Sequence, residues 1–232
     1  MNILGLEIPF LDLIALIWFI FLWVSYSVFS ANKKDNNLVK VMHKYRILWI
    51  RHMIRRSDRT VDINIIKNLL RTATFFASTS ILILAGLVAG LNFAEKGVNL
   101  MASLNIQTTI QMWILKVSLL ITVFIFAFFK FTWVIRQFNY VSVLIVASPV
   151  YKAEDGKINK HKIYTILKYI KTISTMISNA GHHFNIGMRS YYFGLVVLSW
   201  FISPVLFILM SILVVCVLYR REFMSKTLIL LT

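Results

Sequence analysis

The sequence predicts an all-α integral membrane protein with about four transmembrane helices and two basic amphipathic cytoplasmic helices. Of its 232 residues, 59% are hydrophobic, against roughly 45–50% in a typical soluble domain, so a single soluble core cannot hide them. Only 15% of residues are charged, yet the formal net charge is +16. A low fraction of charged residues together with a large excess of Lys and Arg is typical of a chain that crosses a bilayer and contacts anionic headgroups. We expect one membrane domain over residues 1–232.

Four stretches nearly free of ionisable residues are long enough to cross a membrane, since about 20 apolar residues span a hydrocarbon core of roughly 30 Å. They predict membrane helices over residues 9–29, 72–91, 113–135 and 191–218. The last stretch contains Pro204, so a plain fourth span must kink, tilt or protrude. The alternative is a re-entrant hairpin bent at Pro204, with halves of about 21 Å that are too short to cross.

Lys and Arg concentrate in the two large connections between these helices, residues 30–71 and 136–190, which hold 19 of the 25. The positive-inside rule places both connections in the cytoplasm. The N-terminus and residues 92–112 then face the other side, and we expect a bacterial inner membrane. A plain fourth span would leave the basic residues of 220–226 outside, which this topology does not explain.

Apolar residues recur at helical spacing between Lys and Arg in both connections. They predict amphipathic helices over residues 36–56 and 158–177. Either these helices lie at the headgroup level of the membrane, or they pack on each other as a small cytoplasmic subdomain. The sequence leaves both arrangements open. Residues 141–150 are also apolar, and we expect them to extend the third membrane helix inward.

Two charged residues fall inside predicted membrane helices, Asp12 in the first and Lys116 in the third. Both lie about one turn from the outer end, so they share a depth and can form a pair. Intramembrane charges are candidates for a proton or ion relay. The alternatives are a purely structural pair, or side chains that reach the interface by snorkelling.

The second membrane helix carries Gly86 and Gly90, four residues apart. Small residues at this spacing let helix backbones approach closely. They predict a helix-packing face, either within the bundle or between subunits.

A charged run at residues 55–62 precedes the second membrane helix. Arg55, Arg56 and Arg59 have the donors that a phosphate or a lipid headgroup requires. The alternative is a self-satisfied junction in which Thr60 caps the helix and the ion pairs are Arg55–Asp58 and Arg59–Asp62.

No spacing in the sequence completes a metal, nucleotide or catalytic motif. The five histidines, among them His182 and His183, lie in the predicted cytoplasmic connections, and no Cys or carboxylate spacing accompanies them. We therefore expect no cofactor, no metal, no nucleic-acid partner and no catalytic centre.

Several blocks taken together resemble a known family. They are RRSDRTVD (55–62), FFASTSILILAGL (75–87), KFTWVIRQFNY (130–140), FNIGMRSYYF (184–193) and YRREFMS (219–225). Their order is similar to bacterial and plant membrane proteins grouped as domain of unknown function family 599 (DUF599), and the resemblance runs from about Tyr45 to Ser225. It implies a small multi-spanning membrane protein and no activity. It directs attention to Arg55, Asp58, Arg59, Asp62, Arg136, Asn139, Asn185, Arg189, Arg221 and Glu222.

These observations predict a non-enzymatic accessory or scaffolding membrane protein that engages anionic lipid or a larger membrane complex. The candidate headgroup-binding residues are Arg55, Arg56, Arg59, Arg136, Arg189 and Arg221. The alternative is a small homo-oligomeric transporter or channel, because four helices rarely enclose a pathway alone. An enzyme acting on lipid headgroups is a third and weaker hypothesis.

Overall fold

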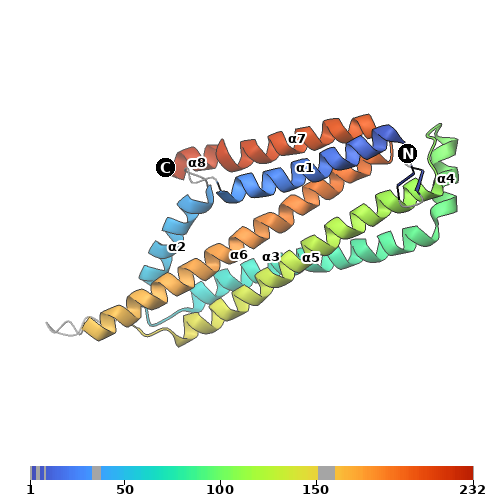
Figure 1. The fold of residues 1–232 in the computed structure, drawn as a ribbon. Coiled ribbons are helices and arrows are strands. Elements are labelled where there is room, and N and C mark those ends of the chain that lie inside the picture. Colours follow the sequence, from blue (N-terminus) through green and yellow to red (C-terminus); the bar gives the residue numbers. More distant parts are fainter. Residues whose placement is uncertain (1, 4–5, 8, 33–37, 151–159, 232) are drawn as a thin grey trace. The chain divides into compact units, whose positions relative to one another are not determined.

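The protein is helical along nearly its whole length in the computed structural model, which describes all residues except 1, 4–5, 8, 33–37, 151–159 and 232 (Figure 1). The described elements, in chain order, are β1 (Asn2–Ile3), β2 (Leu6–Glu7), α1 (Phe10–Asn32), α2 (Leu38–Ile54), α3 (Thr60–Asn92), α4 (Ala94–Ser103), α5 (Ile110–Ala147), α6 (Lys160–Trp200), α7 (Pro204–Phe223) and α8 (Lys226–Leu231). The two short strands pair antiparallel, with Ile3 opposite Leu6. The predicted all-α class is confirmed.

Four helical segments are long and apolar enough to cross a membrane, as predicted. They cover residues 10–30, 60–92, 110–147 and 204–231. At 38 residues, α5 is about 57 Å long, so it also contains the predicted inward extension over residues 141–150 as far as Ala147. Both α3 and α5 include basic residues that bounded the predicted spans, because a charged side chain does not interrupt a helix where the chain leaves the hydrocarbon.

Residues 191–218 do not form a single helix. Instead α6 ends at Trp200 and α7 begins at Pro204. Proline lacks an N–H and clashes with the preceding turn, so it starts a helix well but cannot continue one. Ser203 caps the new helix, its Oγ accepting from the Val205 N–H at 3.3 Å.

The two halves of the predicted re-entrant hairpin, about 21 Å each, are shorter than the helices that form. The 20-residue α7 measures about 30 Å, and the 41-residue α6 about 61 Å. The first helix of the hairpin is longer than expected because α6 begins at Lys160 and not near Arg189.

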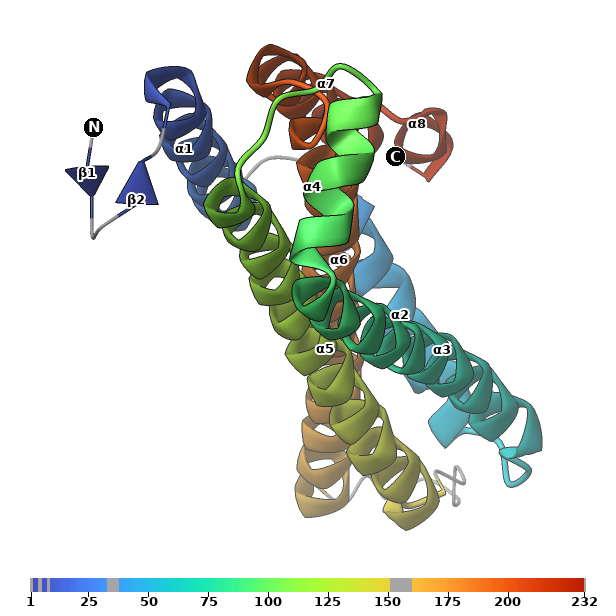
Figure 2. The ribbon, with the colours of Figure 1, turned by 90° about the vertical axis from the view of Figure 1, so that its right-hand side faces the viewer.

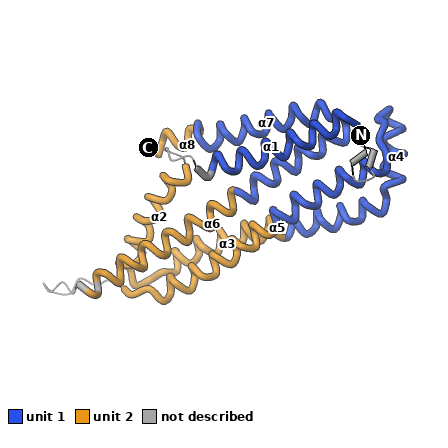
Figure 3. Tube along the Cα trace, in the orientation of Figure 1, with its two compact units in different colours: residues 1–35, 78–128, 186–224 blue, residues 36–77, 129–185, 225–232 orange. Residues whose placement is uncertain are grey.

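The chain divides into two compact units (Figure 3). Unit 1 comprises residues 1–35, 78–128 and 186–224. Its core contains large side chains from α1, α5, α6 and α7, including Phe19, Leu120, Phe193, Trp200 and Phe207. The rings of Trp200 and Phe207 stack at 4.9 Å between centroids, and Phe19 packs on Phe207 at 5.1 Å.

Within unit 1, α1 and α7 pack along each other and run in the same direction, while the end of α6 runs the opposite way (Figure 1). The helix α4 follows α3, and Figure 2 looks onto it. Gly97 of α4 lies against the indole of Trp113, since a Cβ at this glycine would be 2.5 Å from the ring.

Unit 2 comprises residues 36–77, 129–185 and 225–232. Its core joins Ile50, Met53 and Ile54 of α2 to a row of isoleucines of α6 that includes Ile166 and Ile173. Both predicted amphipathic helices are present. The first ends at Ile54, two residues before its predicted end, and its predicted residues 36–37 lie outside the described part of the chain. The second, however, continues to Trp200 instead of ending at residue 177, and its predicted residues 158–159 lie outside the described part of the chain. The two helices pack on each other in unit 2, and their position relative to the lipid headgroups stays a prediction.

Candidate functional site

Three helices of unit 1 meet at Arg189, which is buried at 6% exposure. Its guanidinium donates to both carboxylate oxygens of Glu222, from Nε at 2.7 Å and from Nη2 at 2.9 Å. The same Nη2 donates to the Oγ of Ser30 at 2.5 Å, and that hydroxyl donates to Glu222 at 3.1 Å. This cluster, called the arginine lock below, ties α1, α6 and α7 together.

Aromatic residues flank the arginine lock. The Arg189 guanidinium lies 5.3 Å from the ring centroid of Tyr26, and the buried Tyr26 hydroxyl lies near Glu222 without hydrogen-bond geometry. The neighbouring Arg221 donates to the hydroxyl of Tyr192. Two arginines predicted to bind headgroups are therefore engaged inside unit 1. The sequence did not single out Ser30 or Tyr26, because a lone Ser or Tyr in an apolar helix carries no distinctive spacing.

A second buried polar cluster occupies the opposite end of α1. Asp12 and Lys116 are 8% and 6% exposed. The Asp12 carboxylate accepts from the Trp200 indole N–H at 2.7 Å, and the Lys116 ammonium lies 5.5 Å from the centroid of the same indole. The predicted pair is thus brought together, but through Trp200 and not by a direct ion pair. Because Asp12 and Ser30 are 18 residues apart on α1, the two clusters are separated by about 27 Å along it.

The charged run before α3 forms other pairs than those predicted. Asp62, 1% exposed, accepts from Arg56 at 2.8 Å and from the Trp49 indole at 2.6 Å. The predicted Arg55–Asp58 and Arg59–Asp62 pairs do not form, because residues 55–59 lie outside the helices and the helical spacing does not apply.

Asp58 instead turns the chain into α3. Its carboxylate accepts from the backbone N–H of Thr60 at 2.9 Å and from its hydroxyl at 2.7 Å. The hydroxyl bond, followed by the backbone bond, lowers the pKa of Asp58 below its ordinary value. Thr60 was predicted to cap α3, but here it is the donor and Asp58 the acceptor.

Arg59 is buried, with 9% exposure, and its side chain hydrogen-bonds to the C-terminal end of α5. Its Nη1 donates to the carbonyl of Ile145 and, at 3.3 Å, to that of Val146. A cation at a helix C-terminus complements the helix dipole and satisfies carbonyls left without a partner in the helix. Arg59 is therefore committed to the fold, whereas Arg55 and Arg136 are exposed. Arg136 donates to the hydroxyl of Tyr140 at 2.9 Å.

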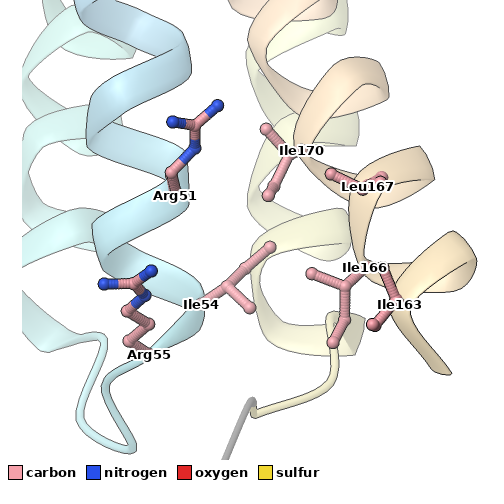
Figure 4. Close-up of a pocket in the computed structure, with 7 residues that line it drawn as sticks. All are labelled: Arg51, Ile54, Arg55, Ile163, Ile166, Leu167 and Ile170. Carbon is pink, nitrogen blue, oxygen red and sulfur yellow. The ribbon is translucent and has the colours of Figure 1, made fainter. Parts of the chain in front are cut away.

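A cavity of about 360 Å³ opens between α2 and α6 of unit 2 (Figure 4). Five aliphatic residues and two arginines line it. They are Ile54, Ile163, Ile166, Leu167 and Ile170, with Arg51 and Arg55. Among the labelled side chains of α6 in Figure 4, Ile166 and Ile170 point toward α2. Arg51 was not among the predicted headgroup-binding residues, although it lines the same cavity as Arg55.

The histidines do not assemble a metal centre among the described residues, which contain no group of three or more His, Cys, Asp or Glu that could hold an ion. His43 shares a hydrogen bond of 2.7 Å with Ser178, to which Arg46 also donates. His182 and His183 contact each other's rings. Burial, then the nearby Lys130 charge and His182, lower the pKa of His183.

A Cβ at Gly86 or Gly90 would meet no atom within 4 Å, so no described helix approaches these two Cα positions closely. The Gly90 carbonyl nevertheless accepts from the Trp113 indole of α5 at 3.2 Å. A contact between subunits stays a prediction.

Comparison with known proteins identifies one family. The family model described as "Protein of unknown function, DUF599" matches residues 14–227. No curated protein and no solved structure matches the chain.

Proposed function

The chain belongs to the DUF599 family, which is described as being of unknown function. From the residues of this chain, we propose that it is an accessory or scaffolding membrane protein whose unit 2 binds anionic lipid headgroups. The observation that carries this proposal is charge segregation. The described residues of unit 2 (38–77, 129–150, 160–185 and 225–231) contain sixteen Lys and Arg but only two acids.

Both of those acids are already engaged. Asp62 is buried against Arg56 and Trp49, and Asp58 holds the start of α3. Neither can neutralise the rest of the surface. A basic segment next to a membrane is attracted to anionic lipid by about 1 kcal/mol for each Lys or Arg near the surface. Unit 2 therefore has the charge that an inner leaflet rich in anionic lipid would attract.

The arrangement of unit 1 supports a topology in which the C-terminus returns to the cytoplasmic side. Ser30 and Glu222 share the arginine lock, so α1 and α7 end on the same side. The basic residues after α1 and those at 220–226 then both face the cytoplasm, as the positive-inside rule requires. In this proposal α6 and α7 form a hairpin that crosses the membrane twice.

Cysteine labelling tests this topology. In a Cys216→Ser background, Gln107→Cys lies in the connection between α4 and α5, and Met224→Cys follows α7; both positions are exposed. We expect a membrane-impermeant maleimide to label position 107 in intact spheroplasts and position 224 only after permeabilisation. Labelling of both from outside would contradict the hairpin.

Headgroup binding is tested in nanodiscs. We expect the intact protein to unfold at a higher temperature in discs containing phosphatidylglycerol than in pure phosphatidylcholine discs, with a difference that falls as salt is raised. The triple variant Lys44→Gln/Lys168→Gln/Lys171→Gln should reduce that difference. Lys96→Gln, on α4 of unit 1, is the control and should leave it unchanged. An equal, salt-independent stability in both discs would refute the proposal.

The second candidate is a small homo-oligomeric transporter or channel, which the Asp12–Trp200–Lys116 cluster favours. Charges retained inside a membrane mark ion and proton pathways by default. The test uses Asp12→Asn and Lys116→Met in liposomes that report ion or solute flux. If both variants remain folded and abolish a flux that the wild type carries, the scaffold proposal is replaced by this one.

A further inference from the structure

We propose that the cavity between α2 and α6 binds a single-chain anionic lipid, with the acyl chain among its aliphatic residues and the acidic head at Arg51 and Arg55. This inference deepens the proposed function and rests on it in one respect, namely that the basic unit 2 lies next to lipid. It goes beyond surface attraction, because it assigns one saturable site to one class of ligand.

The apolar part of the cavity suits a hydrocarbon chain. Ile54, Ile166 and Ile170 are buried, at 1%, 8% and 7% exposure, and form the inner wall. Leu167 is 55% exposed and stands at the edge. Apolar walls that continue to an exposed leucine offer a path from the surface into the interior, and burying apolar surface there is favourable.

The polar part of the cavity suits one anion. Arg51 lies on the last turn of α2, and Arg55 directly follows the end of that helix at Ile54; both line the cavity. No acid is among the lining residues. Neither guanidinium has a hydrogen bond or an ion pair within the described part of the chain. Two like charges that line one cavity repel each other, and a carboxylate or phosphate between them would relieve that repulsion with charge-assisted hydrogen bonds.

The size of the cavity selects the ligand. Its volume of about 360 Å³ is at the lower end of ligand-binding pockets, roughly 300–1,000 Å³. It is therefore matched to part of one acyl chain and not to both chains of a phospholipid. A fatty acid or another acidic single-chain lipid combines that single chain with the anion that the two arginines require.

Photolabelling of the full-length protein in phosphatidylcholine nanodiscs tests the site. The probe is palmitic acid with a diazirine in its chain, and the corresponding alcohol is the uncharged comparison. We expect saturable labelling of peptides from α2 and α6, and labelling by the alcohol at least about tenfold weaker, since one charge-assisted hydrogen bond is worth about that factor. Equal labelling by acid and alcohol would overturn the role of the arginines.

Two pairs of variants make the test specific. Leu167→Trp fills the edge of the cavity and should abolish saturable labelling, whereas Tyr164→Trp, an exposed position on the same helix that does not line the cavity, should not. Arg51→Gln/Arg55→Gln should weaken labelling about tenfold or more, whereas the charge-matched Lys96→Gln/Arg220→Gln, at two exposed positions of unit 1, should not. Wild-type labelling of the Leu167→Trp variant, with its fold intact by thermal unfolding, would overturn the proposal.

The two proposals fail separately. Leu167→Trp leaves the net charge unchanged. The variant should therefore keep the higher unfolding temperature in phosphatidylglycerol discs while its acyl labelling is lost. A protein that shows saturable acyl labelling at α2 and α6 but no phosphatidylglycerol preference would support the cavity and refute headgroup binding by unit 2.

Discussion

Replacing Glu222 by Leu tests whether the arginine lock holds α1, α6 and α7 together. The Arg189 and Glu222 side chains are 7% and 21% exposed, so the substitution leaves a buried guanidinium with only Ser30 as a hydrogen-bonding partner. Removing one member of a buried ion pair costs about 3–5 kcal/mol. The partial exposure of Glu222 places the expected loss near the lower end, at about 3 kcal/mol.

The assay is thermal unfolding of the purified protein in mild detergent. For a chain of this size, 1 kcal/mol corresponds to about 2–4 °C, so Glu222→Leu should lower the midpoint by about 6–12 °C. Ser30→Ala removes two hydrogen bonds to charged groups, Arg189 and Glu222, and should cost about 1.5–3 kcal/mol. Glu95→Gln, which removes an exposed acid of α4, is the matched control and should change the midpoint little.

A double-mutant cycle separates the ion pair from general damage to the helix packing. Arg189→Met/Glu222→Leu removes both charges, and replacing a whole buried pair by apolar residues is often neutral. The double variant should therefore be more stable than Glu222→Leu alone. If the two single losses simply add, the two side chains are not coupled and the reasoning fails.

Two further substitutions follow from the geometry. Gly97→Ala should lower the unfolding midpoint, since the new Cβ would lie 2.5 Å from the Trp113 ring and overpacking costs about 1–3 kcal/mol. The control is Gly86→Ala, whose Cβ would meet no atom within 4 Å and whose stability should be within about 0.5 kcal/mol of wild type. Equal losses of stability in the two variants would contradict the close contact between Gly97 and Trp113. Asp58→Ala should destabilise the start of α3 at neutral pH. Because its pKa is lowered in the folded protein, the stabilisation by Asp58 is present above about pH 4 and is lost as pH falls through the lowered pKa. The difference in midpoint between wild type and Asp58→Ala should therefore disappear in acid, and a difference that persists at the lowest pH would exclude the carboxylate as its cause.

Part of the candidate site could be predicted from the sequence. Asp12 and Lys116 were expected at a similar depth because each lies about one turn from the outer end of a predicted membrane helix. Their connection through Trp200 could not be predicted, since the indole lies 188 residues from Asp12 along the chain. The Arg56–Asp62 pair was missed because helical spacing was applied to residues that lie outside the helices.

The sequence by itself determined the class of fold, the membrane-length apolar segments and the segregation of basic charge. These properties depend on composition and on periodicity within one helix, which the order of residues contains directly. Only the tertiary structure decided that α6 and α7 form separate helices, that α2 packs on α6 and that Ser30, Arg189 and Glu222 meet. Such contacts depend on which faces of distant helices are buried together, and the spacing of residues along one helix does not indicate which other helix packs against it.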